Sequence, residues 1–254
     1  MYRRHFVLFA GISMVLSIPL AALAGYSFFN LFTTFAQQVG TDQPPDVSGL
    51  TSSLTALAVF GLLNLALYPF LYGAITYAAC ESALGRPVTV WGALGGAFRR
   101  YIQIAAYLVL FVLMALMFCL LPLWIWIWVG WIAIMPVMFV EKTGLIAAMG
   151  RSWRLVEGRW WRTFLIVFLM FILIEVVGAA LGAFLLLGQT VLQIFLSPFL
   201  SFAISEGASI LISSLVNPIL QIAIVLIYFD LRVRREGLDL FQLAQRLAAP
   251  QPAS

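Results

Sequence analysis

Charge is what this 254-residue sequence has least of: 9% of its residues are Asp, Glu, Lys or Arg, whereas 63% are hydrophobic. A soluble globular domain carries about 25% charged residues, so the composition excludes an ordinary soluble fold. The chain cannot cover its apolar surface by itself, and lipid must be its main solvent. Its net charge of +4 is only mildly basic, and a membrane fold argues against nucleic acid as a partner.

The residues that usually carry enzymatic chemistry are also scarce. His5 is the one histidine, Cys80 and Cys119 are the two cysteines, and no HExxH, CxxC, GxSxG or Walker lysine motif is present. The spans predicted below place the cysteines near opposite membrane surfaces, farther apart than the roughly 7 Å between Cα atoms that a disulfide allows. We therefore expect no catalytic residue, no metal site and no cofactor, and we interpret the chain as a non-enzyme.

Long hydrophobic runs are abundant instead. A helix of about 20 apolar residues is long enough to cross a bilayer. The sequence predicts an all-α membrane protein, a single domain over residues 1–254, with six spans. They are placed near residues 6–35, 52–80, 102–121, 123–140, 163–188 and 208–230. The first run resembles a cleavable signal peptide as far as Ala24 but continues beyond it, so we expect it to be retained.

The basic residues predict the orientation. All fourteen lie on one side of the predicted spans, whereas the opposite connections, near residues 36–51, 121–123 and 189–207, contain no lysine or arginine. Cytoplasmic loops of membrane proteins are enriched in these residues. We therefore predict a multi-pass protein of the bacterial cytoplasmic membrane with both termini in the cytoplasm. Anionic lipid headgroups on that side are the predicted partners.

The six spans form three hairpins with a shared pattern. The second span of each hairpin contains a proline and ends in an acidic residue, Glu81, Glu141 or Asp230. A glycine and a short amphipathic helix follow, and these interfacial helices are predicted near residues 89–101, 144–160 and 237–247. We expect the three carboxylates to pair with neighbouring arginines, and such pairs at a wet interface contribute about 0–1 kcal/mol each.

The densest charge lies in residues 141–163, between the fourth and fifth spans. Helical spacing places Leu145, Met149, Trp153, Val156 and Trp160 on one face, with arginines opposite. A helix of this kind lies flat at the membrane surface, with its tryptophans in the apolar layer and its arginines near phosphates. The predicted headgroup or interfacial residues are Arg99, Arg100, Arg151, Arg154, Arg159, Arg162, Trp153, Trp160 and Trp161.

Glu175 is the one charged residue deep inside a predicted span. It lies about 20 Å along the helix from Arg162, at a depth similar to that of Asn64, Asn217 and Gln221. Two interpretations of this intramembrane polar cluster are open. Hydrogen bonds within the cluster could hold the helices together, or the cluster could be a proton or ligand site. Replacement of Glu175 by Gln would be tolerated in the first case and not in proton coupling.

One apolar stretch does not fit the spans. Residues 190–207, "TVLQIFLSPFLSFAISEG", are interrupted by Pro198 and are too short to cross the bilayer twice. We expect an outer-surface helix here, or a shallow re-entrant segment shielded by protein.

The C-terminal half contains a pattern of proline, acidic, glycine, aromatic and basic residues that is similar to a known family of membrane domains. The residues concerned are Pro136, Glu141, Gly144, Ser152, Trp153, Arg154, Trp161 and Arg162, then Tyr228, Phe229, Asp230, Leu231, Arg232, Arg234, Arg235, Glu236 and Gly237. This pattern resembles the membrane domain of bacterial glycerophosphodiester phosphodiesterases and of related stand-alone multi-pass membrane proteins. In that family the activity belongs to a separate soluble barrel with its own histidines and acidic metal ligands. The resemblance therefore implies a membrane fold and no enzymatic activity for these 254 residues.

Two functions follow from these observations. The first is a non-catalytic accessory, scaffolding or assembly subunit that contacts lipid headgroups and other membrane-protein subunits. The alternative is a small transporter or lipid-handling protein that uses an intramembrane polar site around Glu175. A continuous polar cavity that reaches Glu175 would favour the alternative, whereas dry packing around this side chain would favour the accessory subunit.

Overall fold

The structure is a computed structural model that describes residues 6–38, 47–116 and 121–236, and every regular element in these ranges is a helix. The helices are α1 (Phe6–Gln38), α2 (Val47–Ala83), α3 (Val90–Phe98), α4 (Tyr101–Leu116), α5 (Leu121–Gly130), α6 (Ile134–Val140), α7 (Leu145–Val156), α8 (Trp160–Phe195) and α9 (Pro198–Glu236). The all-α fold class is confirmed. Five segments are long and apolar enough to cross a membrane, or six if α3 and α4 are counted as one span bent by 72°.

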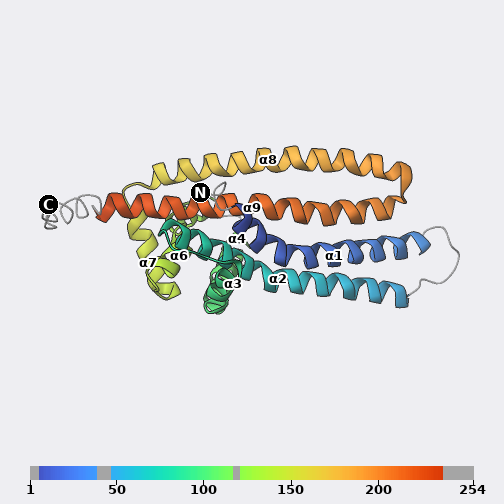
Figure 1. Cartoon of the computed structure of the whole chain (residues 1–254), viewed down its shortest axis with the longest axis horizontal. Coiled ribbons are helices and arrows are strands. Elements are labelled where there is room, and N and C mark those ends of the chain that lie inside the picture. The colour runs from blue at the N-terminus through green and yellow to red at the C-terminus, as the bar shows by residue number, and fades with distance from the viewer. Residues whose placement is uncertain (1–5, 39–46, 117–120, 237–254) are drawn as a thin grey trace, which may run out of the picture.

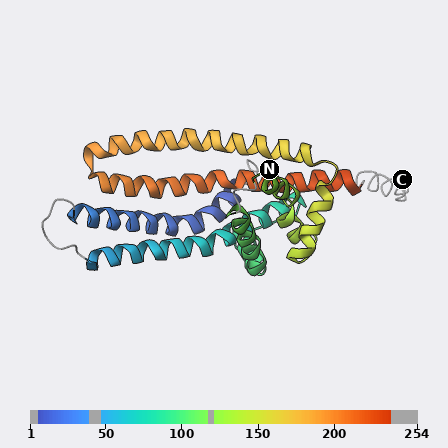
Figure 2. The same ribbon diagram turned by 180° about the vertical axis from the view of Figure 1, so that it is seen from behind.

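Four long helices, α1, α2, α8 and α9, run lengthwise through the molecule, and the five short helices gather near one end (Figures 1 and 2). We call this the basic end; α1 and α8 begin there and α2 and α9 finish there. The long helices contain 33 to 39 residues. At 1.5 Å per residue they reach about 50–58 Å, well beyond the roughly 30 Å of a bilayer core. They must therefore tilt strongly or project from the hydrocarbon.

Helices α1 and α9 approach each other closely through small residues. A Cβ atom on Gly25 would lie 3.2 Å from the carbonyl oxygen of Ala203, and one on Gly207 would lie 3.3 Å from that of Ala21. Helices in membranes associate by such backbone proximity, because lipid provides no hydrophobic driving force between them. The α1–α9 pair therefore forms the centre of the long bundle. Helix α2 packs on both of these helices, and α8 packs on α9.

The expected surface or re-entrant segment over residues 190–207 is wrong. Helix α8 continues to Phe195, and α9 begins at Pro198, so the segment divides between two continuous helices. Leu196 is extended and Ser197 accepts a hydrogen bond from the Leu200 amide at 3.3 Å, which gives α9 a serine cap followed by proline. Proline favours the first helical position because it has no amide hydrogen to satisfy.

The middle hairpin also differs from the expectation. Its predicted second span, 123–140, is broken at residues 131–133 into α5 and α6, and α4 and α5 do not pack along each other. Ser152 of α7 forms hydrogen bonds with the backbone groups on either side of this break in the helix. Its Oγ donates to the Gly130 carbonyl at 2.8 Å and accepts from the Ala133 amide at 3.2 Å. The break does not remove the predicted span, because Pro122–Val140 as a whole is one of the five segments long and apolar enough to cross a membrane.

Candidate functional site

Helix α9 carries a polar face through the middle of the bundle. Glu206, Ser209, Ser213 and Asn217 are spaced by three, four and four residues, so they lie on one side of the helix. This stretch of α9 faces two cavities that share Ser209, Ser213 and Asn217. We call the two cavities together the polar groove.

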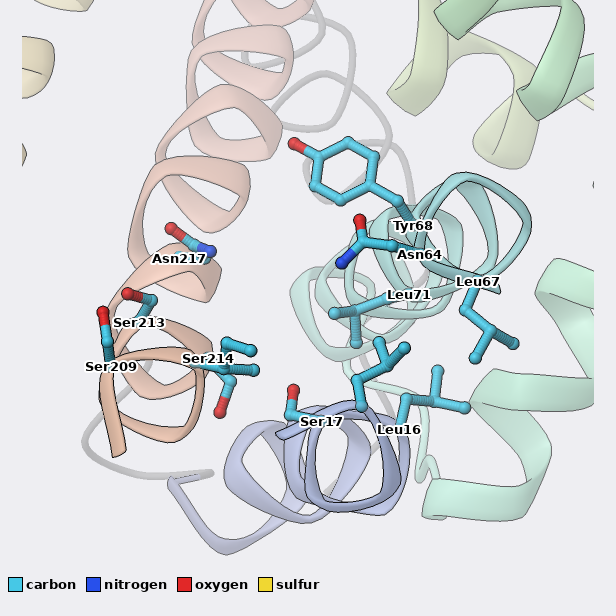
Figure 3. A pocket seen from close by; sticks show the side chains of 12 residues that line it. Leu16, Ser17, Asn64, Leu67, Tyr68, Leu71, Ser209, Ser213, Ser214 and Asn217 are labelled. Carbon is cyan, nitrogen blue, oxygen red and sulfur yellow. The ribbon is translucent and has the colours of Figure 1, made fainter. Parts of the chain in front are cut away.

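The first cavity, about 240 Å³, lies between α1, α2 and α9 (Figure 3). Asn64 of α2 and Asn217 of α9 stand on opposite walls with their amide groups directed toward the intervening space. Ser17 of α1 forms part of the floor, and Tyr68 covers the Asn64 side. Leucines from α1 and α2 complete the lining, so polar and apolar side chains alternate around the cavity.

The second cavity, about 190 Å³, lies between α8 and α9. Glu175 lines it from α8, beside Gly178 and Gly182, and the serines and Asn217 line it from α9. A Cβ atom added to either glycine would meet nothing within 4 Å. The absence of side chains at these two positions therefore helps to keep the space between α8 and α9 open.

The polar groups of the groove have unused hydrogen-bonding capacity. Within the described residues, Asn64, Glu175 and Asn217 make no side-chain hydrogen bond and no ion pair. Outside both cavities, the carbonyl oxygen of the buried Gln221 side chain also has no partner among these residues. Polar groups in a hydrocarbon environment cost several kcal/mol each, roughly, when they are unsatisfied. Water or the polar part of a ligand must therefore satisfy them.

The predicted intramembrane cluster is brought together only in part. Asn64 and Asn217 share the first cavity, and Asn217 and Glu175 share the second, but Gln221 lines neither. No hydrogen bond joins any two of these four described side chains, so this cluster makes no direct bond between helices of the kind that structural glue requires. The serines and Tyr68 were not predicted as site residues, although the four-residue spacing of Ser209, Ser213 and Asn217 indicates a shared helical face.

The predicted pairing of helix-end carboxylates with arginines is confirmed. Glu81 pairs with Arg86 at 3.3 Å, and Asp230 pairs with Arg234 at 2.7 Å and with Arg162 at 3.5 Å. Glu141 pairs with Arg151 at 3.1 Å. All these pairs lie at the basic end.

The Glu141 pair is the centre of a larger network that ties α7 to the end of α9. The hydroxyl of Tyr228 donates to Glu141 at 3.1 Å, and Arg232 donates to that hydroxyl at 3.2 Å. Glu236 pairs with both Arg151 and Arg232. The Glu141 and Arg151 side chains are only 18% and 26% exposed, so this network is less screened by water than an ordinary surface ion pair.

Several residues predicted to face lipid headgroups also contact protein. Arg151 and Arg162 are engaged in the ion pairs above, Arg159 donates to the Arg234 carbonyl at 3.4 Å, and Arg100 donates to that of Thr143 at 2.8 Å. The Trp153 ring contacts Trp126 and lies over Gly130, while Trp160 donates to the Trp126 carbonyl at 3.1 Å. Arg99, Arg154 and Trp161 are exposed, and lipid contact by these residues stays a prediction.

The remaining predicted features are tested only where residues are described. The interfacial helices near 89–101 and 144–160 correspond to α3 and α7, whereas residues 237–247, His5 and Cys119 lie outside the described ranges. Cys80 is buried and free. Among the described residues, no group of three or more His, Cys, Asp and Glu side chains could hold a metal ion. That the chain is not an enzyme stays a prediction.

Comparison with known proteins adds no relative to this description. No protein family, no curated protein and no solved structure was found that matches the chain. The resemblance to the membrane domain of glycerophosphodiester phosphodiesterases therefore stays a prediction based on the sequence pattern alone.

Proposed function

We propose that this chain is a lipid-handling membrane protein that receives the polar part of an amphiphilic molecule in the groove between α2, α9 and α8. The observation that carries the proposal is the pair of cavities joined by Ser209, Ser213 and Asn217, with Glu175 on one wall. A lipid headgroup in such a groove could satisfy the unpaired amides and the carboxylate while its acyl chains stay in the surrounding lipid.

The position of the groove supports this function. Glu175 lies about 20 Å along α8 from Arg162, and the polar face from Glu206 to Gln221 covers about 22 Å of α9. That length is most of a bilayer core of about 30 Å. The polar face therefore lowers the desolvation cost for a headgroup over much of the distance between the two leaflets.

The charges in the groove indicate the class of headgroup. Its described lining contains the carboxylate of Glu175 and no lysine or arginine. Glutamate, asparagine and serine oxygens accept hydrogen bonds, so headgroups with ammonium or hydroxyl donors fit better than purely anionic ones. Phosphatidylethanolamine has this chemistry and is a suitable probe.

A reconstitution experiment tests the proposal. Vesicles that contain phosphatidylethanolamine with a fluorescent acyl chain are treated with a membrane-impermeant quencher, which at first reaches only the outer leaflet. The wild-type protein should render nearly the whole fluorescent pool accessible. Gly182→Leu, which fills the α8–α9 cavity, should slow this movement at least about tenfold, because a headgroup would lose one or more hydrogen bonds on its path.

The controls separate the groove from α8 as a whole. Gly188→Leu makes the same substitution on the same helix, outside both cavities and with nothing within 4 Å of its Cβ, and should leave the rate unchanged. Glu175→Leu should be slow, whereas Glu175→Gln, which keeps hydrogen-bonding atoms, should be intermediate. Equal rates for Gly182→Leu, Gly188→Leu and protein-free vesicles would reject the proposal.

An accessory role remains the second candidate, and one observation favours it. From Phe168 to Phe195, no residue of α8 is buried, and α8 packs mainly on α9. This long apolar surface could receive another membrane protein as well as lipid. Gentle purification followed by identification of associated chains tests this role: a stoichiometric partner that is lost in a variant with polar residues at Leu173 and Phe184 would support it.

A further inference from the structure

A second groove, distinct from the polar groove, lies at the basic end between the first turns of α4 and α7. It has a volume of about 400 Å³ and an almost wholly apolar lining. Its walls are Ile102, Gln103 and Ala106 of α4 and Leu145, Ile146 and Ala147 of α7. Ile102 and Ile146 are 82% and 85% exposed, so an apolar surface is open on both sides of the groove.

Cationic residues precede both helices that line this α4–α7 groove, and we call the place where these helices begin the cationic corner. Arg99 and Arg100 directly precede α4, and Lys142 lies two residues before the cap of α7. Arg100 links the starts of α4 and α7, since its guanidinium donates to the Thr143 carbonyl at 2.8 Å and to the Gln103 side chain at 3.3 Å. Three cationic residues therefore lie at the head of one apolar groove.

These cations differ from most others in the described chain. Arg99 and Lys142 are exposed, and neither side chain pairs with any carboxylate in the described ranges. The neighbouring carboxylate, Glu141, is engaged with Arg151 and Tyr228. The positive charge at this corner is thus not neutralised by the protein that surrounds it.

The start of α7 adds a further preference for an anion. Its cap residue is Gly144, which offers no side-chain acceptor, and its first turn contains no acidic residue. The first hydrogen bond within the helix runs from the Ala148 amide to the Gly144 carbonyl at 2.9 Å. The preceding amides have no acceptor within the helix, and such amides favour negative charge.

We propose that the α4–α7 groove binds one anionic phospholipid, with its phosphate at the corner formed by Arg99 and Lys142 and an acyl chain between Ile102 and Ile146. On α3, Phe98 directly precedes Arg99 and is 73% exposed, and Trp91 near the start of the same helix is 76% exposed. Exposed aromatic side chains of this kind favour a position at the level of lipid headgroups. The site is independent of the polar groove: it selects an anion, and it holds the lipid in place at one surface.

Native mass spectrometry of the full chain, released from detergent with equal amounts of phosphatidylglycerol and phosphatidylcholine, tests this site. We expect one phosphatidylglycerol to be retained in preference to phosphatidylcholine. The double variant Arg99→Gln/Lys142→Gln should lower that retention about tenfold or more. Its unfolding temperature should equal that of the wild type, because no described residue forms an ion pair with either side chain.

Two matched variants make the test specific. Arg154→Gln removes another exposed, unpaired cation outside the groove and should change retention less than about twofold. Ala147→Trp fills the apolar part of the groove and should also release the lipid. Equal retention of phosphatidylcholine, or an equal loss in Arg154→Gln, would overturn the proposal. Displacement of the lipid by inorganic phosphate alone would do so as well, since it would identify a site for a free anion.

Discussion

Leucine in place of Gly25 should destabilise the protein by at least about 2 kcal/mol, the largest loss we expect from any single change in the long bundle. A Cβ atom added to Gly25 would lie 3.2 Å from the Ala203 carbonyl oxygen. The obstacle is backbone of α9, which cannot rotate away as a flexible side chain could. The remaining leucine atoms would force α1 and α9 apart and separate Gly207 from Ala21 as well.

Unfolding of the purified protein in detergent, followed by tryptophan fluorescence, measures this loss. Gly61→Leu in α2 is the matched control, because a Cβ atom there meets nothing within 4 Å, and it should shift stability by less than about 0.5 kcal/mol. Equal stability of the Gly25 and Gly61 variants would mean that α1 and α9 are not packed as described.

Alanine in place of Glu141 should have the second large effect, about 2–4 kcal/mol of lost stability. This carboxylate accepts from Arg151 and from the Tyr228 hydroxyl, and both side chains of the ion pair are less than one third exposed. Its removal leaves Arg151 with Glu236 as its carboxylate partner and deprives the buried Tyr228 of its acceptor. The same unfolding measurement applies.

Glu157→Ala is the comparison that isolates burial from charge. Glu157 also pairs with an arginine, Arg235 at 3.3 Å, but its side chain is 62% exposed. Its loss should cost about 0–1 kcal/mol, and added salt should reduce that small effect further because screening acts most strongly on exposed charges. If both variants lost the same amount, the network around Glu141 would be an ordinary surface feature.

The sequence was sufficient for those parts of the fold that depend on local pattern. Apolar runs long enough for a bilayer predicted α1 and α2 to within a few residues. The short helix predicted near 89–101 is α3, which begins after Thr89, whose hydroxyl accepts from the Gly92 amide at 3.1 Å. The ion pairs between acidic residues at helix ends and arginines could be predicted because both partners lie where the helices meet water. These features need no knowledge of how distant helices pack.

The turn between α8 and α9 was missed for a different reason. The serine–proline pair at 197–198 is a signal for the start of a helix, but we interpreted the proline as an interruption of an apolar segment. The predicted fifth span stopped at residue 188 and the predicted sixth span began at residue 208. The structure instead has helices that are much longer than a bilayer requires.

The polar groove lay beyond what the sequence could show. Asn64 of α2 and Glu175 of α8 are 111 positions apart in the sequence, and each shares a cavity with Asn217 of α9. Similar depth suggested that they would form hydrogen bonds with one another. Packing instead left open space between them, which depends on where α8 is held relative to α2 and α9, and on the glycines at 178 and 182.

The central claim is that this groove is open to water within the membrane-spanning part of the bundle, and thiol labelling tests it most directly. In a background with Cys80→Ala and Cys119→Ala, cysteine is introduced at Ser213 in the groove or at Leu173 on α8, which is exposed but lines neither cavity. The cysteine thiolate attacks water-soluble thiosulfonate reagents, forming a mixed disulfide and releasing a sulfinate, and the thiolate forms readily only in a polar environment. In vesicles, Ser213→Cys should react at least about tenfold faster than Leu173→Cys. Equal and slow reaction at both positions would show that the groove is dry, and would contradict the proposed function.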